Sequence, residues 1–177
     1  MGIKTASGSR LSGSLPAGLV LLNTTSFSGV ASQSINDVFS ATYNNYLIIV
    51  DDLIRNTGGG LDVYLRLRVS GTDSTTGYYY GQGYSLWGSD LAGTGRVNNG
   101  GQFSAAGCSS TNKGYSMIWL QNPFLTKITG YQTIQTRHDA GSYSGGYNSA
   151  ATSYTGFSIV ADSNNLTGTV STYGFNK

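Results

Sequence analysis

The sequence lacks glutamate altogether and has one cysteine, one histidine and two prolines among its 177 residues. Only 10% of its residues are charged, compared with about 25% in a typical soluble domain. Surface helices usually rely on Glu and Lys, so this composition disfavours a protein built from long helices. The single cysteine, Cys108, excludes a disulfide framework within the chain. With only one histidine beside it, a zinc site is equally disfavoured.

The charges that are present form no pattern that indicates a nucleic-acid or membrane partner. The net charge is +2, and Lys and Arg are scattered along the chain rather than gathered in a stripe. The longest apolar runs, Leu19–Leu22 and Leu47–Val50, fall far short of the ~20 residues of a membrane helix. Residues 1–6 lack the apolar stretch of a signal peptide. We therefore expect no nucleic-acid binding, no membrane insertion and no export.

What the sequence has in abundance is glycine (26 residues) and tyrosine (13 residues), beside many Ser, Thr and Asn. Across Leu61–Ser70, apolar and polar residues alternate, which indicates a half-buried β-strand. The apolar run Tyr46–Asp51 precedes it and predicts another strand. The glycines of Asn56–Gly60 permit positive φ, so we expect these two strands to form a hairpin.

Further strand candidates follow at regular spacing, separated by clusters of Gly, Asn, Asp and Ser that favour turns. These candidates are Leu19–Phe27, Ile35–Phe39, Gly77–Trp87, Gly101–Ala105, Gly114–Asn122, Thr126–Arg137, Tyr154–Asp162 and Leu166–Phe175. About ten strands at such intervals predict an all-β, antiparallel β-sandwich of jelly-roll type. We place it at residues 17–177 as a single domain, after an extended Gly/Ser-rich N-terminal arm at residues 1–16. One helical turn is expected at Phe39–Tyr43.

The residue types that usually carry catalysis are too few or too dispersed to predict a site. His138 and Asp139 are neighbours at an apparent strand end, and no Gly-x-Ser-x-Gly elbow supplies a nucleophile for them. A pairing of Cys108 with His138 stays open on sequence alone. The Gly107–Gly114 segment lacks the second glycine of a phosphate loop. Since most aspartates also fall in turn-like sequence, we assign no catalytic residue, no cofactor and no metal, and predict that the protein is not an enzyme.

The aromatic residues are the strongest candidates for recognition. Between residues 78 and 87, alternation places Tyr78, Tyr80 and Tyr84 on one face of a strand, and Trp87 follows near its end. Such rings serve as rigid anchors at protein interfaces or as platforms on which sugars stack. Tyrosine also populates ordinary strands, so a purely structural role is the alternative. These four residues are our candidate contacts for a partner protein or a glycan.

Four short stretches resemble bacteriophage virion proteins, especially capsid decoration (cement) proteins and tail-fibre tip domains. They are Tyr43–Ile49, Leu65–Gly71, Asn122–Phe124 and Leu166–Phe175, spread over most of residues 27–177. The resemblance implies a phage-type β module that usually forms a homotrimer and has no universal catalytic residues. It does not separate decoration proteins from fibre tips, because both use such modules.

From this resemblance we expect a non-enzymatic virion structural protein, made in the host cytoplasm and located at the capsid surface or the tail. The first hypothesis is a trimeric decoration protein that binds the major capsid protein or other virion proteins and stabilises the outer shell. In this hypothesis the predicted arm lies along the shell or a neighbouring subunit. The alternative is a tail-fibre or spike module that recognises host surface glycans through Tyr and Trp rings. A polysaccharide-degrading enzyme is least favoured, because Glu is missing and His and Cys occur once each.

Overall fold

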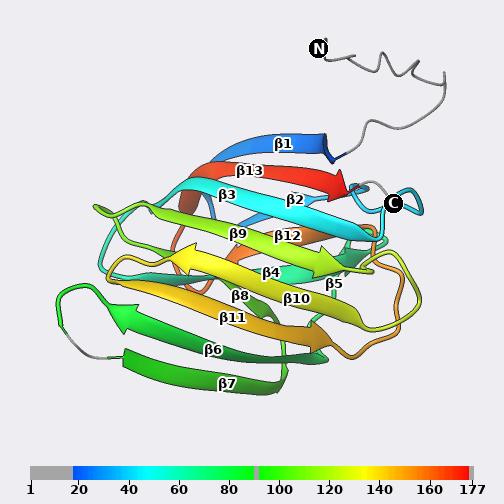
Figure 1. The fold of residues 1–177 in the computed structure, drawn as a ribbon. Coiled ribbons are helices and arrows are strands. Elements are labelled where there is room, and N and C mark those ends of the chain that lie inside the picture. Colours follow the sequence, from blue (N-terminus) through cyan, green and yellow to red (C-terminus); the bar gives the residue numbers. More distant parts are fainter. Residues whose placement is uncertain (1–17, 90–91, 176–177) are drawn as a thin grey trace, which may run out of the picture.

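The computed structural model describes residues 18–89 and 92–175, which form two antiparallel β-sheets packed face to face (Figure 1). In chain order the strands are β1 (Leu19–Val30), β2 (Ser32–Ile35), β3 (Asn45–Arg55), β4 (Leu61–Val69), β5 (Thr72–Asp73), β6 (Tyr78–Leu86), β7 (Ala92–Gly100), β8 (Phe103–Cys108), β9 (Gly114–Gln121), β10 (Thr129–Thr136), β11 (Ala140–Asn148), β12 (Gly156–Ala161) and β13 (Leu166–Phe175). The described residues contain no helix, and hence none that could cross a bilayer.

The larger sheet has eight strands in the order β1-β13-β3-β9-β10-β11-β6-β7. The smaller sheet joins β2, β12, β4 and β5 in that order, and β8 pairs with the first half of β4 on the side away from β12, the side on which β5 pairs with its end. The prediction of an all-β, antiparallel β-sandwich is therefore confirmed, while the jelly-roll connectivity stays a prediction. The predicted arm at residues 1–16 lies outside the described residues.

The core lies between the sheets because each strand turns alternate side chains inward. In β4 the predicted alternation is confirmed, and it buries Val63, Leu65 and Leu67. Phe103 of β8 stacks on Tyr131 of β10, with ring centroids 4.1 Å apart. Aromatic stacking thus joins the two sheets near the centre of the sandwich.

The predicted hairpin between β3 and β4 is wrong. β3 belongs to the larger sheet and β4 to the smaller, so the glycine-rich segment between them carries the chain from one sheet to the other. Arg55, at the end of β3, is buried, and its guanidinium donates to the carbonyl oxygens of Gly59 and Gly60 at 2.8 and 3.0 Å. These bonds hold the crossing segment in place.

Three strands, β5, β7 and β11, have no counterpart in the sequence prediction. β7 and β11 are rich in Gly, Ser and Asn and show no apolar alternation. β11 nevertheless forms because it pairs along its length with both β10 and β6. The strand predicted at Ile35–Phe39 instead runs from Ser32 to Ile35, and the helical turn predicted at Phe39–Tyr43 is a plain turn.

Candidate functional site

The face of the larger sheet that points away from the core exposes a continuous set of apolar side chains. Among the described residues, the exposed large hydrophobic side chains lie on strands of this sheet, except for Trp87 and Ile128 in loops. We call the outward positions of β9, β10, β11 and β6 the outer face. They are Tyr115, Met117, Trp119 and Gln121 on β9, Gly130, Gln132, Ile134 and Thr136 on β10, Gly141, Tyr143, Gly145 and Tyr147 on β11, and Tyr79, Gly81, Gly83 and Ser85 on β6. A contiguous apolar face of this kind is typical of a docking surface.

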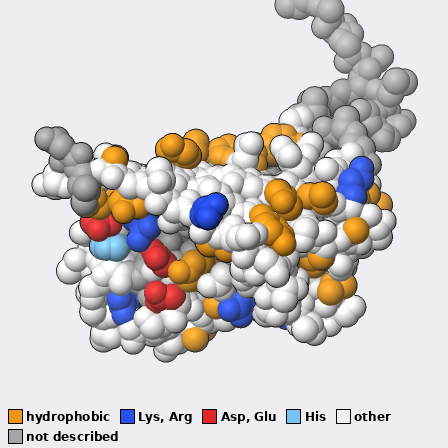
Figure 2. Space-filling model, turned by 90° about the horizontal axis from the view of Figure 1, so that it is seen from below, with side chains coloured by type: hydrophobic (Ala, Val, Ile, Leu, Met, Phe, Trp, Pro, Cys, Tyr) orange, Lys and Arg blue, Asp and Glu red, His pale blue; other side chains and the backbone are white. Residues whose placement is uncertain are grey.

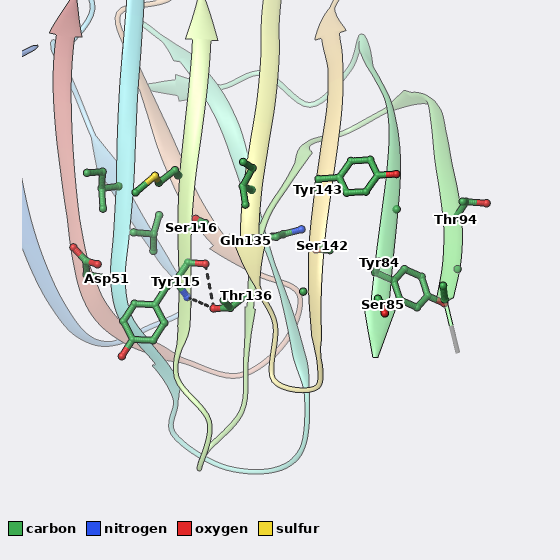
Figure 3. A pocket seen from close by; sticks show the side chains of 18 residues that line it. Asp51, Tyr84, Ser85, Thr94, Tyr115, Ser116, Gln135, Thr136, Ser142 and Tyr143 are labelled. Carbon is green, nitrogen blue, oxygen red and sulfur yellow. Dashed lines mark hydrogen bonds between the residues drawn. The ribbon is translucent and has the colours of Figure 1, made fainter. Parts of the chain in front are cut away.

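Ile134 and Tyr143 stand directly opposite each other on β10 and β11 and form a ridge at the centre of the outer face. The surface is hollow on both sides of this ridge. The first hollow, of about 1160 Å³, is bordered by Met117 on β9 and extends across to β7 (Figure 3). The second hollow, of about 780 Å³, is bordered by Trp119 and Gln132. Ile134 and Tyr143 border both hollows and separate them.

The ring of Tyr143 leans onto the neighbouring strand β6. Gly83 is its cross-strand partner, and a Cβ atom at Gly83 would lie 2.7 Å from the Tyr143 hydroxyl oxygen. The glycine therefore makes room for the ring, which Figure 3 shows directed toward that strand. Further along β11, Tyr147 stacks on Tyr79 with ring centroids 5.2 Å apart. These contacts hold the rings against the sheet, so a partner has less side-chain entropy to remove on binding.

Charged groups lie at the border of the outer face rather than within it. None of its positions, all in the described part of the chain, carries a charged side chain. At one end, Asp52 pairs with Lys113 at 2.9 Å and accepts a hydrogen bond from the Tyr115 hydroxyl at 2.9 Å. The Lys113 ammonium and then the Tyr115 hydroxyl hold the pKa of Asp52 below its ordinary value. Asp51 of β3 is exposed and lines the edge of the first hollow (Figure 3). Docking on the outer-face positions themselves strips water from no charged side chain, but a partner that fills the first hollow comes close to this carboxylate.

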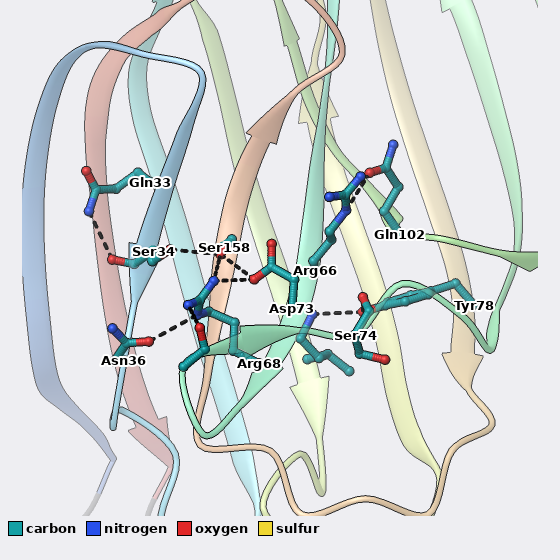
Figure 4. A network of polar contacts seen from close by, with 12 residues as sticks. Gln33, Ser34, Asn36, Arg66, Arg68, Asp73, Ser74, Tyr78, Gln102 and Ser158 are labelled. Carbon is teal, nitrogen blue, oxygen red and sulfur yellow. Dashed lines mark hydrogen bonds and ion pairs between the residues drawn. The ribbon is translucent and has the colours of Figure 1, made fainter.

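The outer side of the smaller sheet differs, because its polar groups bond to one another (Figure 4). Arg68 of β4 pairs with Asp73 of β5 and donates to Ser158 Oγ at 2.8 Å and to Asn36 Oδ1 at 3.0 Å. The Ser158 hydroxyl donates to Asp73 at 2.8 Å. Because these groups already satisfy one another, a partner would gain few new hydrogen bonds there. The two sides of the sandwich therefore offer very different surfaces.

The structure separates the four aromatic residues that were predicted as contacts. Tyr78, Tyr80 and Tyr84 do share one face of β6, but it is the inner face. Tyr78 is fully buried and Tyr80 is 9% exposed, so neither ring is available to a partner. Tyr84 is half-buried, its ring covers Gly93 of β7, and it lines the first hollow (Figure 3). Trp87 is 62% exposed just after β6 and stays a candidate contact.

The single cysteine and the single histidine lie in different environments. Cys108 is a core residue whose burial raises the pKa of its thiol to about 11, which makes it a poor nucleophile at neutral pH. His138 lies in the loop between β10 and β11, where its Nε2 is 3.3 Å from Asp139 Oδ1. Figure 2 shows this histidine, in pale blue, among charged side chains at one end of the molecule. The described residues include no group of three or more His, Cys, Asp or Glu able to hold a metal ion.

Sequence reasoning missed Ile134, Tyr143 and Met117, the most exposed apolar side chains of the outer face. In β10, Thr133 and Gln135 are buried and Ile134 between them is exposed, which reverses the usual pattern of apolar residues inside and polar residues outside. The sequence shows the alternation, but only the strand pairing shows which side faces the core, so the sequence alone contains no signal for these residues.

Comparisons of the chain with protein-family models, with curated proteins and with solved structures find no significant match. No residue role is therefore transferred from a relative.

Proposed function

We propose that this chain is a non-enzymatic structural protein of a bacteriophage virion, a trimeric decoration protein that binds the outer capsid shell. The observation that carries the proposal is the contrast between the two sides of the sandwich. The outer face of the larger sheet is apolar and uncharged, whereas the smaller sheet is covered by polar groups that bond to one another. A protein that docks against neighbours needs one such apolar surface, whereas a catalyst needs converging polar groups.

Binding through the outer face draws its free energy from the burial of side chains that project from a rigid sheet. Complete burial of Ile134 and of Tyr143, which are 64% and 67% exposed, contributes about 2 kcal/mol each. Both residues belong to strands that are paired on both sides, so their backbones need no ordering when a partner docks. The face thus has the properties of a preformed anchor.

Immunogold electron microscopy of purified particles, with antibodies against this chain, tests the proposal. Label spread over the shell supports a decoration protein, and label at the tail tip supports the tail-fibre alternative. A virion role is contradicted if the particles bind no antibody and mass spectrometry does not detect the chain in them. A variant that lacks residues 2–16 should keep its fold, because it retains every strand of the described residues, the first of which begins at Leu19. It should lose capsid retention if the predicted arm binds the shell.

The second hollow favours a second candidate function, glycan recognition by a tail-fibre or spike module. Trp119 and Tyr143 supply aromatic rings there, beside the amide side chains of Gln121, Gln132 and Asn45. Sugars stack on such rings and exchange hydrogen bonds with amides. Because the lining carries no charge, the chemistry fits a neutral saccharide.

A glycan array with purified protein tests this second function. Trp119→Ala and Gln132→Ala should each abolish a signal that depends on the second hollow. Trp87→Ala, outside that hollow, separately tests the contact predicted from sequence. Val160→Ala, on the smaller sheet, is the control and should keep the wild-type signal. Undiminished binding by Trp119→Ala would exclude the second hollow as a sugar site.

A further inference from the structure

We propose that the outer face binds a second copy of this chain, with the Ile134–Tyr143 ridge of each copy seated in the first hollow of a neighbour. The inference rests on the proposed function for the existence of an assembly, and it deepens that function by naming the surface and its occupant. Three properties of the face carry it: its area, its neutrality and its shape.

The exposed side of the larger sheet is wide enough for a stable contact between protein subunits. With strands about 4.8 Å apart and about eight residues of about 3.3 Å each, the four strands of the outer face span about 500 Å². The adjoining strands β3, β13 and β1 extend the same side of the sheet to about 900 Å² and add Asp51 of β3. Stable interfaces bury about 800 Å² on each partner. Leu19 and Leu21 of β1, which are 49% and 56% exposed, continue the apolar surface at the far edge of the same sheet.

The absence of charge from the outer face suits an identical partner in particular. When two copies of one surface meet, like charges can be brought close together, which costs free energy unless each finds an opposite partner. The described positions of the outer face carry no charge, and Asp51 at the edge of the first hollow is the charged side chain of its lining. The ridge that enters the hollow, Ile134 and Tyr143, brings no second charge to it. Ile134 and Met117 also have no hydrogen-bonding side chain to offer a polar ligand, yet they are 64% and 48% exposed.

The shape of the face is self-complementary. The ridge of Ile134 and Tyr143 lies beside the first hollow, which is bordered by Met117, Tyr115 and Thr136. A copy related by a twofold axis in the plane of the face can place its ridge in this hollow while its own hollow receives the opposite ridge. A twofold contact joins two copies only; the trimer of the proposed function requires the ridge of each copy to enter the first hollow of the next, head to tail, with a threefold rotation between copies. Close packing of this kind gives protein interfaces their affinity.

The mass of the full chain in solution tests the inference, measured by light scattering after gel filtration across a dilution series. The wild type should have two or three times the monomer mass of 18.6 kDa. Ile134→Arg should weaken association about 100-fold, because the guanidinium of the new side chain loses its water in the interface without gaining an oppositely charged partner. Ile134→Thr, a milder change that suits an exposed strand position, should weaken association less and keep the circular dichroism of the fold.

Val160→Arg is the matched control. Val160 is half-buried on the outward side of β12, in the smaller sheet, so this variant should keep the wild-type mass. A wild type that is monomeric at every concentration contradicts both the inference and the homotrimer of the proposed function. An oligomer that persists unchanged in Ile134→Arg and Ile134→Thr contradicts the inference alone, because assembly then uses another surface.

Discussion

Ile134 and Tyr143 form a cross-strand pair at the centre of the larger sheet, and neither is covered: the two side chains are 64% and 67% exposed. The neighbouring pair on the same two strands, Thr133 and Ser144, points inward and is buried. The usual distribution of a sandwich, apolar inside and polar outside, is therefore inverted here. Such an inversion is expected where folding and assembly divide the apolar side chains between a core and an interface.

The inverted core depends on hydrogen bonds that replace apolar packing. The Tyr131 hydroxyl bonds to the carbonyl oxygen of Ser104 and to Ser144 Oγ. Tyr131→Phe removes both bonds and leaves buried polar atoms without this partner, so urea unfolding should show a loss of about 2 kcal/mol. Tyr143→Phe, which removes an exposed hydroxyl, is the control and should leave the free energy of unfolding unchanged. Equal stability of the two variants would contradict this account.

Two adjacent glycines of β11 should respond very differently to the same substitution. A Cβ atom at Gly146 would lie 1.9 Å from the carbonyl oxygen of Tyr79, whereas one at Gly145 meets nothing closer than 3.8 Å. Gly146→Ala should therefore push β11 away from β6 and lower the midpoint of thermal unfolding by several degrees or prevent folding. Gly145→Ala should unfold near the wild-type midpoint. If both variants unfold at the same temperature, the close packing of Gly146 against the backbone of Tyr79 is contradicted.

The ion pair of the smaller sheet should matter more than the ion pair at the border of the outer face. The Arg68 and Asp73 side chains are only 12% and 21% exposed, so Asp73→Ala leaves a largely buried guanidinium without its carboxylate. We expect a loss of about 2 kcal/mol in denaturant unfolding. Lys113→Ala removes the exposed pair with Asp52 and should have no measurable effect on unfolding. A larger effect of Lys113→Ala than of Asp73→Ala would reverse this ranking.

The buried phenols and thiol should make the protein sensitive to alkali. Burial raises the pKa of Tyr80 to about 12 and that of Cys108 to about 11, and it also raises the pKa of Tyr78 and Tyr131. The unfolded chain releases these protons near the ordinary values of 9.0 and 10.0, while the folded chain still holds them. The contribution of these groups to the free energy of unfolding should therefore be constant below about pH 9 and fall from there to about pH 12.

Urea titrations at stepped pH measure this dependence, with tyrosinate absorbance to follow ionisation. Tyr80→Phe should flatten the alkaline slope, because one of the groups that hold a proton in the folded state is gone. A free energy of unfolding that stays level or rises up to pH 12 would show that these groups are not buried.

The sequence predicted the existence of most strands, because apolar alternation is a local property. It did not predict which side of each strand faces the core, since that depends on strand pairing. Tyr78 and Tyr80 show the difference: their common face was predicted, and only the pairing of β6 with β11 places that face inside. The strand β11 was missed for a different reason: its Gly/Ser-rich sequence shows no apolar alternation, and Tyr143 was missed with it. The hairpin expected between β3 and β4 failed because glycines permit a turn but do not specify which sheet follows it.

Side-chain footprinting with a short-lived radical tests most directly the claim that the outer face is covered in the assembled state. Labelling of Met117 and Tyr143 is compared between dilute protein and concentrated protein or purified particles, with Tyr64 on the smaller sheet as the internal control. The account predicts that labelling of Met117 and Tyr143 falls severalfold on assembly while that of Tyr64 is unchanged. Equal labelling of Met117 and Tyr143 in the dilute and assembled states would contradict it.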